Sequence, residues 1–246
     1  MRARTLAALA VLMVFATVPL RAAEPERPVA PDGATAPRHA AGDDATSHHS
    51  FADAERWSKV FDDPARDAWQ KPDTVVTTLA LKPGMTVADL GAGTGYFIGR
   101  LSRAVGASGL VLAIDPEPDM TRHLGERAKK EGLTNVLPVL GLFDDPLLPK
   151  GRVDRVLIVD TYHHIDGRRA YFGRMRAALA KGGQVAIVDF HKKPLPVGPP
   201  PEHKLERATV VEEMTGAGWR LAKESTDLPY QYFLIFEPEA TGGAAS

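Results

Sequence analysis

The strongest constraint in this sequence is the alternation of short β-rich runs with helical stretches between residues 83 and 190. The β-rich runs are apolar on both faces and read MTVADL, LVLAID, VLPVL, VDRVLIVD and QVAIVDF. Strands that bury both faces and are separated by helices form a parallel sheet, which right-handed crossovers cover on both sides. We therefore expect a doubly wound α/β fold.

The chain after Gly218 predicts how this sheet ends. Two further β-like runs follow, WRLAKEST and YQYFLIFE, and the second alternates aromatic and aliphatic residues with polar ones. Two neighbouring runs of this kind are typical of an antiparallel hairpin. The full prediction is a mostly parallel seven-stranded sheet with helices on both faces and a C-terminal antiparallel hairpin.

The N-terminus has the order of a secretion signal. Arg2 and Arg4 precede an apolar run over residues 6–18, and small residues follow at Ala22 and Ala23. This order is typical of a signal peptide, and the run is shorter than the roughly 20 residues that a membrane-spanning helix needs. We expect an exported, periplasmic protein without stable membrane insertion after cleavage. An uncleaved inner-membrane anchor is the alternative.

Composition sets the remaining boundaries. The segment before residue 51 is rich in Pro, Ala, Asp and His and lacks periodic apolar residues, so it cannot bury enough surface to order itself. Apolar and aromatic residues at helical spacing then precede the first strand. The predicted regions are a signal peptide (1–22), a disordered linker (23–50), N-terminal helices (51–82), the α/β domain (83–238) and a flexible tail (239–246).

Charge and cysteine usage exclude several kinds of function. The chain has 30 basic and 31 acidic residues, a formal net charge of −1, so no global field favours nucleic acid or an anionic membrane surface. Cysteine is absent, which excludes disulfides and thiolate chemistry. Reactivity must therefore come from carboxylates, histidine, tyrosine or a cofactor, and no nucleic-acid partner is expected.

The segment VADLGAGTGY, residues 87–96, lies where the first strand turns into a helix. Its glycines, Gly91, Gly93 and Gly95, let the backbone approach a ligand closely, beyond the carboxyl end of the strand. Asp115 ends the second strand, 20 residues after the last glycine, where a carboxylate accepts hydrogen bonds from ribose hydroxyls. An adenosine-containing ligand is therefore predicted.

Two residues indicate which adenosine ligand it is. The third glycine of the dinucleotide pattern would fall at position 96, which is Tyr96. Asp89 stands at the mouth of the loop, where a carboxylate repels a pyrophosphate and attracts an ammonium group. A cationic, phosphate-free ligand fits better than NAD, so an NAD-dependent oxidoreductase is the weaker alternative.

The segment VADLGAGTGYF resembles the first motif of the class I S-adenosylmethionine-dependent methyltransferases, whose fold is Rossmann-like, and AIDPEPDM resembles the segment at their second strand. The similarity covers most of residues 65–237. The resemblance implies that S-adenosylmethionine is the cofactor, with its methionine part at the glycine loop and its ribose at Asp115. The predicted cofactor-binding residues are Asp89, Gly91, Gly93, Gly95, Tyr96, Asp115, Pro116, Met120, Asp144 and Asp160.

Asp144 is included because of a departure from the family pattern. Many relatives carry an acidic residue directly after the third strand, where it contacts the adenine amino group. Here the stretch reads GLFDD, which displaces the carboxylate by about two residues. By resemblance, Asp144 or Asp145 takes this role and Phe143 packs on adenine. Alternatively, the two aspartates only open the turn at Pro146.

The tips of the fourth and fifth strands carry the candidate chemistry. The fourth ends in Asp160-Thr161-Tyr162-His163-His164, and the fifth in Asp189-Phe190-His191. Neighbouring parallel strands bring these tips together on the substrate side. A histidine there can take a proton from the acceptor, so Tyr162, His163 and His164 are the predicted catalytic residues. The alternative is that one histidine packs against the following helix. These residue types also bind metals, but no tight ligand spacing is present, and we predict no metal site.

The segment Trp69-Gln70-Lys71-Pro72 resembles an element of a bacterial subgroup that also has Tyr-His-His after the fourth strand. It implies that residues 51–82 form a lid over the cofactor, although Trp69 can instead anchor an N-terminal helix. The predicted function is methyl transfer to a small-molecule acceptor. A non-catalytic protein that binds the adenosyl ligand is the alternative from another class.

Overall fold

The computed structural model describes residues 51–240. The predicted signal peptide, the predicted linker and most of the predicted tail lie outside the described residues. No described helix has both the length and the apolar character needed to cross a membrane.

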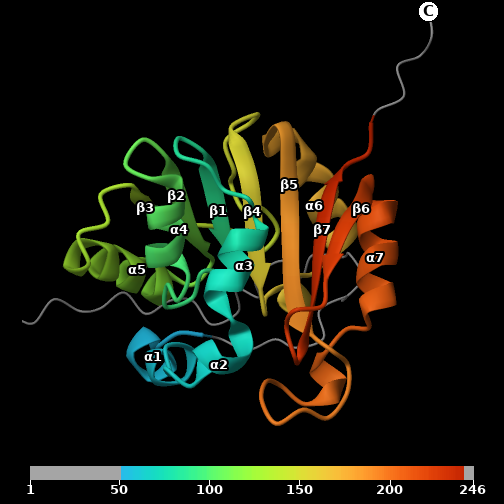
Figure 1. Cartoon of the computed structure of the whole chain (residues 1–246), viewed down its shortest axis with the longest axis horizontal. Coiled ribbons are helices and arrows are strands. Elements are labelled where there is room, and N and C mark those ends of the chain that lie inside the picture. Colours follow the sequence, from blue (N-terminus) through green and yellow to red (C-terminus); the bar gives the residue numbers. More distant parts are fainter. Residues whose placement is uncertain (1–50, 241–246) are drawn as a thin grey trace, which may run out of the picture. The chain divides into compact units, whose positions relative to one another are not determined.

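One sheet of seven strands organises the described chain (Figure 1). The strand order is β3-β2-β1-β4-β5-β7-β6. The first five strands along the chain are parallel, and β7 runs antiparallel to both β5 and β6. The strands are β1 (Thr86–Leu90), β2 (Leu110–Asp115), β3 (Val136–Leu140), β4 (Val153–Val159), β5 (Leu179–Phe190), β6 (Trp219–Ser225) and β7 (Gln231–Pro238). The predicted fold class, including the C-terminal hairpin, is confirmed.

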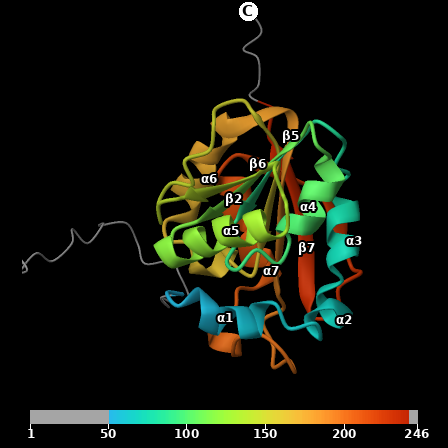
Figure 2. The same cartoon turned by 90° about the vertical axis from the view of Figure 1, so that its left-hand side faces the viewer.

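Helices cover both faces of the sheet (Figure 2). Figure 2 shows α3 and α4 on one side of the sheet and α6 on the other. The α-helices are α1 (Ala54–Phe61), α2 (Arg66–Gln70), α3 (Pro72–Thr78), α4 (Ile98–Val105), α5 (Pro118–Lys130), α6 (Arg168–Met175) and α7 (Arg207–Gly216). The short 3₁₀ helices are η1 (Tyr162–His164), η2 (Arg176–Ala178) and η3 (Pro201–His203).

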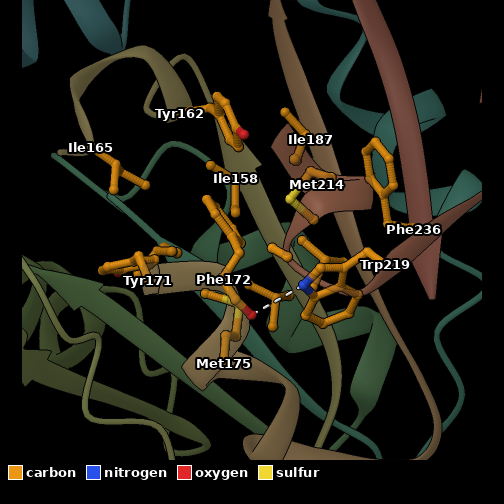
Figure 3. Packing of buried hydrophobic residues seen from close by; sticks show 14 of the residues in the cluster. Ile158, Tyr162, Ile165, Tyr171, Phe172, Met175, Ile187, Met214, Trp219 and Phe236 are labelled. Carbon is orange, nitrogen blue, oxygen red and sulfur yellow. Dashed lines mark hydrogen bonds between the residues drawn. The ribbon is translucent and has the colours of Figure 1, made fainter. Parts of the chain in front are cut away.

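The alternation of side chains along each strand divides the core into two layers. In β2, Leu112 and Ile114 join the core cluster under α6 and α7, whereas Val111 joins the cluster under α3 and α4. Figure 3 shows the first cluster, in which the indole Nε1 of Trp219 donates a hydrogen bond to the carbonyl of Phe172 at 3.0 Å. Because side chains pack against both faces of the central strands, the carboxyl ends of these strands are held in place.

The strand order reverses between β1 and β4, which places a crevice at the carboxyl ends of these strands. Helices α1 and α2 lie beyond this end of the sheet (Figures 1 and 2). An ion pair between Asp62 and Arg127 of α5 (2.8 Å) and a hydrogen bond from the Tyr96 hydroxyl to Asp67 attach them there. The N-terminal helices are therefore part of the same end of the molecule as the glycine loop.

Candidate active site

A cavity of about 510 Å³ opens at the carboxyl ends of β1, β2 and β4. Its size lies within the range of roughly 300–1,000 Å³ that is usual for small-molecule sites. The loops after β1, β2, β3 and β4 all contribute to its walls, together with residues from the N-terminal segment. It contains most of the predicted site residues, whose positions are described below.

The glycine loop after β1 forms the cavity floor through backbone contacts. The N–H groups of Gly91 and Ala92 donate to the Ile114 carbonyl at 2.9 and 3.0 Å. Gly91 has a φ of +71°, and a Cβ atom there would lie 2.4 Å from the Thr161 side chain. Position 91 therefore requires glycine for its backbone conformation and for its close contact with the tip of β4.

Gly95 has a different role from the other glycines of the loop. It has a φ of +89°, and a Cβ atom there would lie 2.9 Å from Ile98 and from Leu124 of α5. Gly95 does not line the cavity, whereas Gly91 and Gly93 do. It permits the turn and the packing of α5 beneath it, and Tyr96, which lines the cavity, follows directly.

Asp89 gives the clearest indication of the ligand's charge. This residue of β1 is 3 % exposed, and its Oδ2 atom has no hydrogen-bond partner within the described part of the chain. Burial raises the pKa of Asp89 to about 7; the charge of Arg66 opposes this rise and that of Asp115 adds to it. A buried carboxylate oxygen without a partner is unfavourable, and an ammonium donor would satisfy it. Thr94 also lines the cavity, and its Oγ1 is a second buried atom that no group in residues 51–240 satisfies.

Asp115 at the end of β2 is held by backbone donors. Its carboxylate accepts from the N–H groups of Gly93 at 2.9 Å and Glu117 at 3.0 Å. Burial raises its pKa to about 6, and the two hydrogen bonds oppose that rise. Pro116 and Met120 line the cavity beside it. The residues expected around the ribose are thus together on one wall.

Asp160, directly after β4, is one of four side chains that form a closed ring of hydrogen bonds. Gln231 Nε2 donates to Asp160 Oδ1 at 2.6 Å, and Arg66 Nη2 lies 3.3 Å from Asp160 Oδ2. Gln70 closes the ring, because it accepts from Arg66 Nη2 at 3.0 Å and donates to Gln231 at 2.8 Å. Asp160 has a φ of 52°, an unusual conformation for a non-glycine residue. Burial raises its pKa to about 6, against the opposing charge of Arg66. We call these four residues the Asp160 ring.

The three predicted catalytic residues lie in different places. His164 lines the cavity, and its ring centroid is 5.2 Å from that of Phe51. His163 is buried behind it, with Nδ1 2.8 Å from the carboxylate of Asp189, and this charge raises the pKa of His163 against the effect of burial. Tyr162 lies in the core among the residues of Figure 3, where its hydroxyl donates to Glu213 at 2.9 Å. The structure brings only His164 of the three to the cavity wall.

The loop after β3 reaches the cavity with its apolar residues. Leu142 and Phe143 line the cavity, whereas Asp144 and Asp145 do not. Asp145 Oδ1 accepts from the backbone N–H of Leu147 at 2.8 Å, which is a local turn contact. The structure thus gives Asp145 the turn-forming role that the sequence left open, and it does not place Asp144 at an adenine site.

The N-terminal segment covers the cavity, but not through the residues that suggested a lid. Trp69 packs against the rings of Phe190 and Tyr230, with centroids at 5.6 and 6.4 Å. Phe51, Phe61 and Arg66 line the cavity instead. The aromatic residues at positions 51–61 predicted an ordered element there, but they did not indicate that this element contacts the cavity.

Fold and site together define a class of protein. The mostly parallel seven-stranded sheet with its terminal antiparallel hairpin has the same overall fold as a solved SAM-dependent methyltransferase. The family model described as a methyltransferase domain matches residues 87–183, which include the glycine loop and strands β2 to β4. Residues 87–183 are therefore similar to a methyltransferase domain.

Individual relatives agree with this class. A solved structure of a SAM-dependent methyltransferase from Aquifex aeolicus is 29% identical, with a TM-score of 0.71, over 75% of this chain and 97% of that one. The ubiquinone/menaquinone biosynthesis C-methyltransferase UbiE of Shewanella pealeana is 26% identical over 133 residues, 54% of this chain. The match spans about half the length of that relative. The [4+2]-cyclase SpnF shares the fold, with a TM-score of 0.56 and 16% identity, over 63% of this chain and 58% of its own.

Proposed function

We propose that this protein is an S-adenosylmethionine-dependent methyltransferase that acts on a small molecule. The observation that carries the proposal is Asp89, a buried carboxylate on the cavity wall with one oxygen atom that no described group satisfies. The amino group of the cofactor's methionine part would supply the missing donor, and no phosphate would be tolerated there. The Shewanella relative, described as a C-methyltransferase of ubiquinone and menaquinone biosynthesis, supports a small-molecule acceptor.

Different residues of the cavity would bind different parts of the cofactor. Asp89, Gly91 and Gly93 would hold the methionine part, Asp115 the ribose, and Pro116, Met120, Leu142 and Phe143 the adenine. When bound, S-adenosylmethionine supplies an electrophilic methyl group on a sulfonium ion. The protein's contribution is then alignment of the two reactants and exclusion of water, which Phe51, Phe61 and Arg66 support by covering the cavity.

His164 is the residue that we propose accepts the acceptor's proton. It lies on the cavity wall beside Phe51, and a neutral imidazole is a suitable base near pH 7. Asp160 is less suitable because both of its oxygens already accept hydrogen bonds from the ring. A His164→Gln variant should bind S-adenosylhomocysteine as the wild type does but lose most of its transfer rate.

Calorimetric titration tests the cofactor directly. The protein should bind S-adenosylhomocysteine in a 1:1 complex and should not bind NAD. Transfer of radiolabelled methyl from the cofactor into a metabolite extract then separates an enzyme from a protein that only binds the ligand. That alternative stays open because fold alone does not specify methyl transfer, as the cyclase neighbour illustrates.

The cellular location belongs to the same proposal. The order of residues at the N-terminus supports export to the periplasm with cleavage of residues 1–22, after which no stable membrane insertion is expected. Fractionation of cells that express the full chain, with mass spectrometry of the mature N-terminus, tests this. A chain that keeps residue 1 and sediments with membranes would favour the uncleaved anchor.

A further inference from the structure

The part of the cavity beyond the cofactor-binding residues has an apolar wall. Phe51 and Ile165 contribute to this wall, with His164 beside Phe51, whereas Tyr171 lines the cavity nearer Asp144 and Asp145 of the loop after β3. Phe51 spans the mouth, because its N–H donates to Glu117 Oε1 after β2 at 3.1 Å while its ring lies against His164 after β4. A second ligand in this space would contact mainly rings and aliphatic carbon.

Acidic side chains outnumber basic side chains among the residues that line the cavity. Arg66 is the only arginine or lysine among the described lining residues, and it already donates to the Phe61 carbonyl, to Gln70 and to Asp160. Five carboxylates line the same cavity, namely Asp89, Asp115, Glu117, Asp160 and Asp166. An anion in this space would meet several like charges in a poorly solvated site, with no lining lysine or arginine that lacks a partner.

The wall and the charges together restrict the chemical class of the acceptor. We propose that the cavity admits an uncharged, mainly apolar, ring-shaped methyl acceptor and rejects anions of the same size. This inference rests on the proposed function and names the substrate class of the same site.

A cationic ring is also disfavoured by the contacts in place. Its ammonium group would lose hydration against Phe51 and Ile165. Two of the nearby carboxylates are already engaged, because Asp160 accepts from Arg66 and Gln231, and Glu117 accepts from the N–H of Phe51. An uncharged ring, in contrast, brings no charge that needs a partner in the cavity.

Three probes that share a ring and a hydroxyl group test the proposal: p-cresol, 4-hydroxybenzoate and tyramine. Each is titrated by NMR at millimolar concentrations into protein saturated with S-adenosylhomocysteine. We expect p-cresol to bind tightest and 4-hydroxybenzoate to bind at least tenfold more weakly. Binding of 4-hydroxybenzoate or of tyramine that is equal to or tighter than that of p-cresol would overturn the proposal.

A charge reversal at the cavity rim provides a gain-of-binding test. Asp166 is an exposed carboxylate of the lining, so Asp166→Lys places a cation at the cavity without disturbing the core. We expect it to raise the affinity for 4-hydroxybenzoate at least fivefold more than the affinity for p-cresol. The matched control is Glu126→Lys, which makes the same change in net charge on the exposed face of α5 and should alter neither affinity. An equal gain in both variants would contradict a local charge effect.

The outcomes separate this inference from the proposed function. If S-adenosylhomocysteine binds but none of the three probes binds to the complex, the substrate class is wrong and the cofactor assignment stands. If S-adenosylhomocysteine itself does not bind, the proposed function fails first, and the acceptor assignment fails with it.

Discussion

The two ends of the cavity are built in different ways. At the cofactor end, the loop after β1 is fixed by its own backbone, through the N–H groups of Gly91 and Ala92 and through the bond from Gly93 to Asp115. At the other end, beside the tip of β4 and His164 and here called the acceptor end, the Asp160 ring joins side chains that are distant in sequence, and Gln70 and Gln231 are 161 residues apart. The comparison teaches that the cofactor end depends on backbone geometry and two carboxylates, Asp89 and Asp115, whereas the other end depends on side-chain contacts between separate elements. Single substitutions should therefore change ligand affinity and the free energy of unfolding more at the cofactor end than at the acceptor end.

The largest effect is expected from Asp89→Asn. The variant loses the charge that would pair with the cofactor's ammonium group, which costs about 3–4 kcal/mol, or roughly 100- to 1,000-fold in affinity. The unliganded variant should be as stable as the wild type or more stable, because a buried carboxylate with an unsatisfied oxygen is removed. Calorimetry with S-adenosylhomocysteine measures the first quantity and urea unfolding the second. Retention of full affinity would contradict the assigned role of Asp89.

The pH dependence of binding should be the next largest effect. The pKa of Asp89 is raised to about 7 in the unliganded protein, and the bound ammonium group requires the ionised form. Affinity for S-adenosylhomocysteine should therefore fall about tenfold per pH unit below 7, roughly 100-fold between pH 7 and 5. Asp89→Asn, although weaker overall, should lose this dependence. A wild-type affinity that is constant from pH 8 to 5 would exclude titration of Asp89 as the cause.

Stability without ligand should change with pH in the opposite direction. The pKa values of Asp89, Asp115 and Asp160 are raised to about 7, 6 and 6, above the ordinary value of 3.8. Between pH 4 and 7 the folded protein therefore binds more protons than the unfolded chain, and the free energy of unfolding falls as pH rises through this window. Urea titrations at several pH values measure the slope, which should be shallower in Asp89→Asn.

Two glycines test how strongly the backbone of the loop after β1 depends on its contact with the tip of β4. Gly91 and Gly132 have similar positive φ angles, +71° and +68°, but only Gly91 would place a Cβ atom against another residue, Thr161 at 2.4 Å. Gly91→Ala should therefore lower the free energy of unfolding by about 1–3 kcal/mol more than Gly132→Ala does. Chemical denaturation of both variants tests this, and equal losses would show that the contact with Thr161 relaxes at no cost.

The same contrast explains how much the sequence could predict. The fold and the cofactor end are encoded locally, by strand-length apolar runs and by glycines and carboxylates at fixed spacing around residues 87–115, so the predicted residues there lie together on the cavity wall. Gly95 is the exception, since it packs under the loop. Nothing in the local sequence distinguishes His164, which lines the cavity, from His163, which turns toward Asp189.

The acceptor end could not be predicted because its contacts form only when the chain is folded. Arg66 and Gln231 carry no spacing signal, and Gln70, although part of the Trp69-Gln70-Lys71-Pro72 element, gave no indication of its contact with Gln231. Tyr162 adjoins two histidines in a motif, yet its side chain points into the core and is held by Glu213. Whether a residue next to a strand tip faces the cavity or the core depends on the turn that follows, here the 3₁₀ helix η1.

The smallest effect is expected from opening the Asp160 ring, because three of its members remain when one is removed. Gln231→Leu keeps the volume of the side chain but removes the donor to Asp160 and the acceptor for Gln70, so Arg66 and α2 should be held less firmly. We expect the dissociation rate of S-adenosylhomocysteine to rise about fivefold, which corresponds to roughly 1 kcal/mol. Stopped-flow measurement of that rate, with Gln184→Leu on the same sheet, away from the cavity, as the control, tests the link. If both variants release the ligand at the wild-type rate, the ring stabilises the fold but does not hold the cover over the cavity, and the two ends act independently.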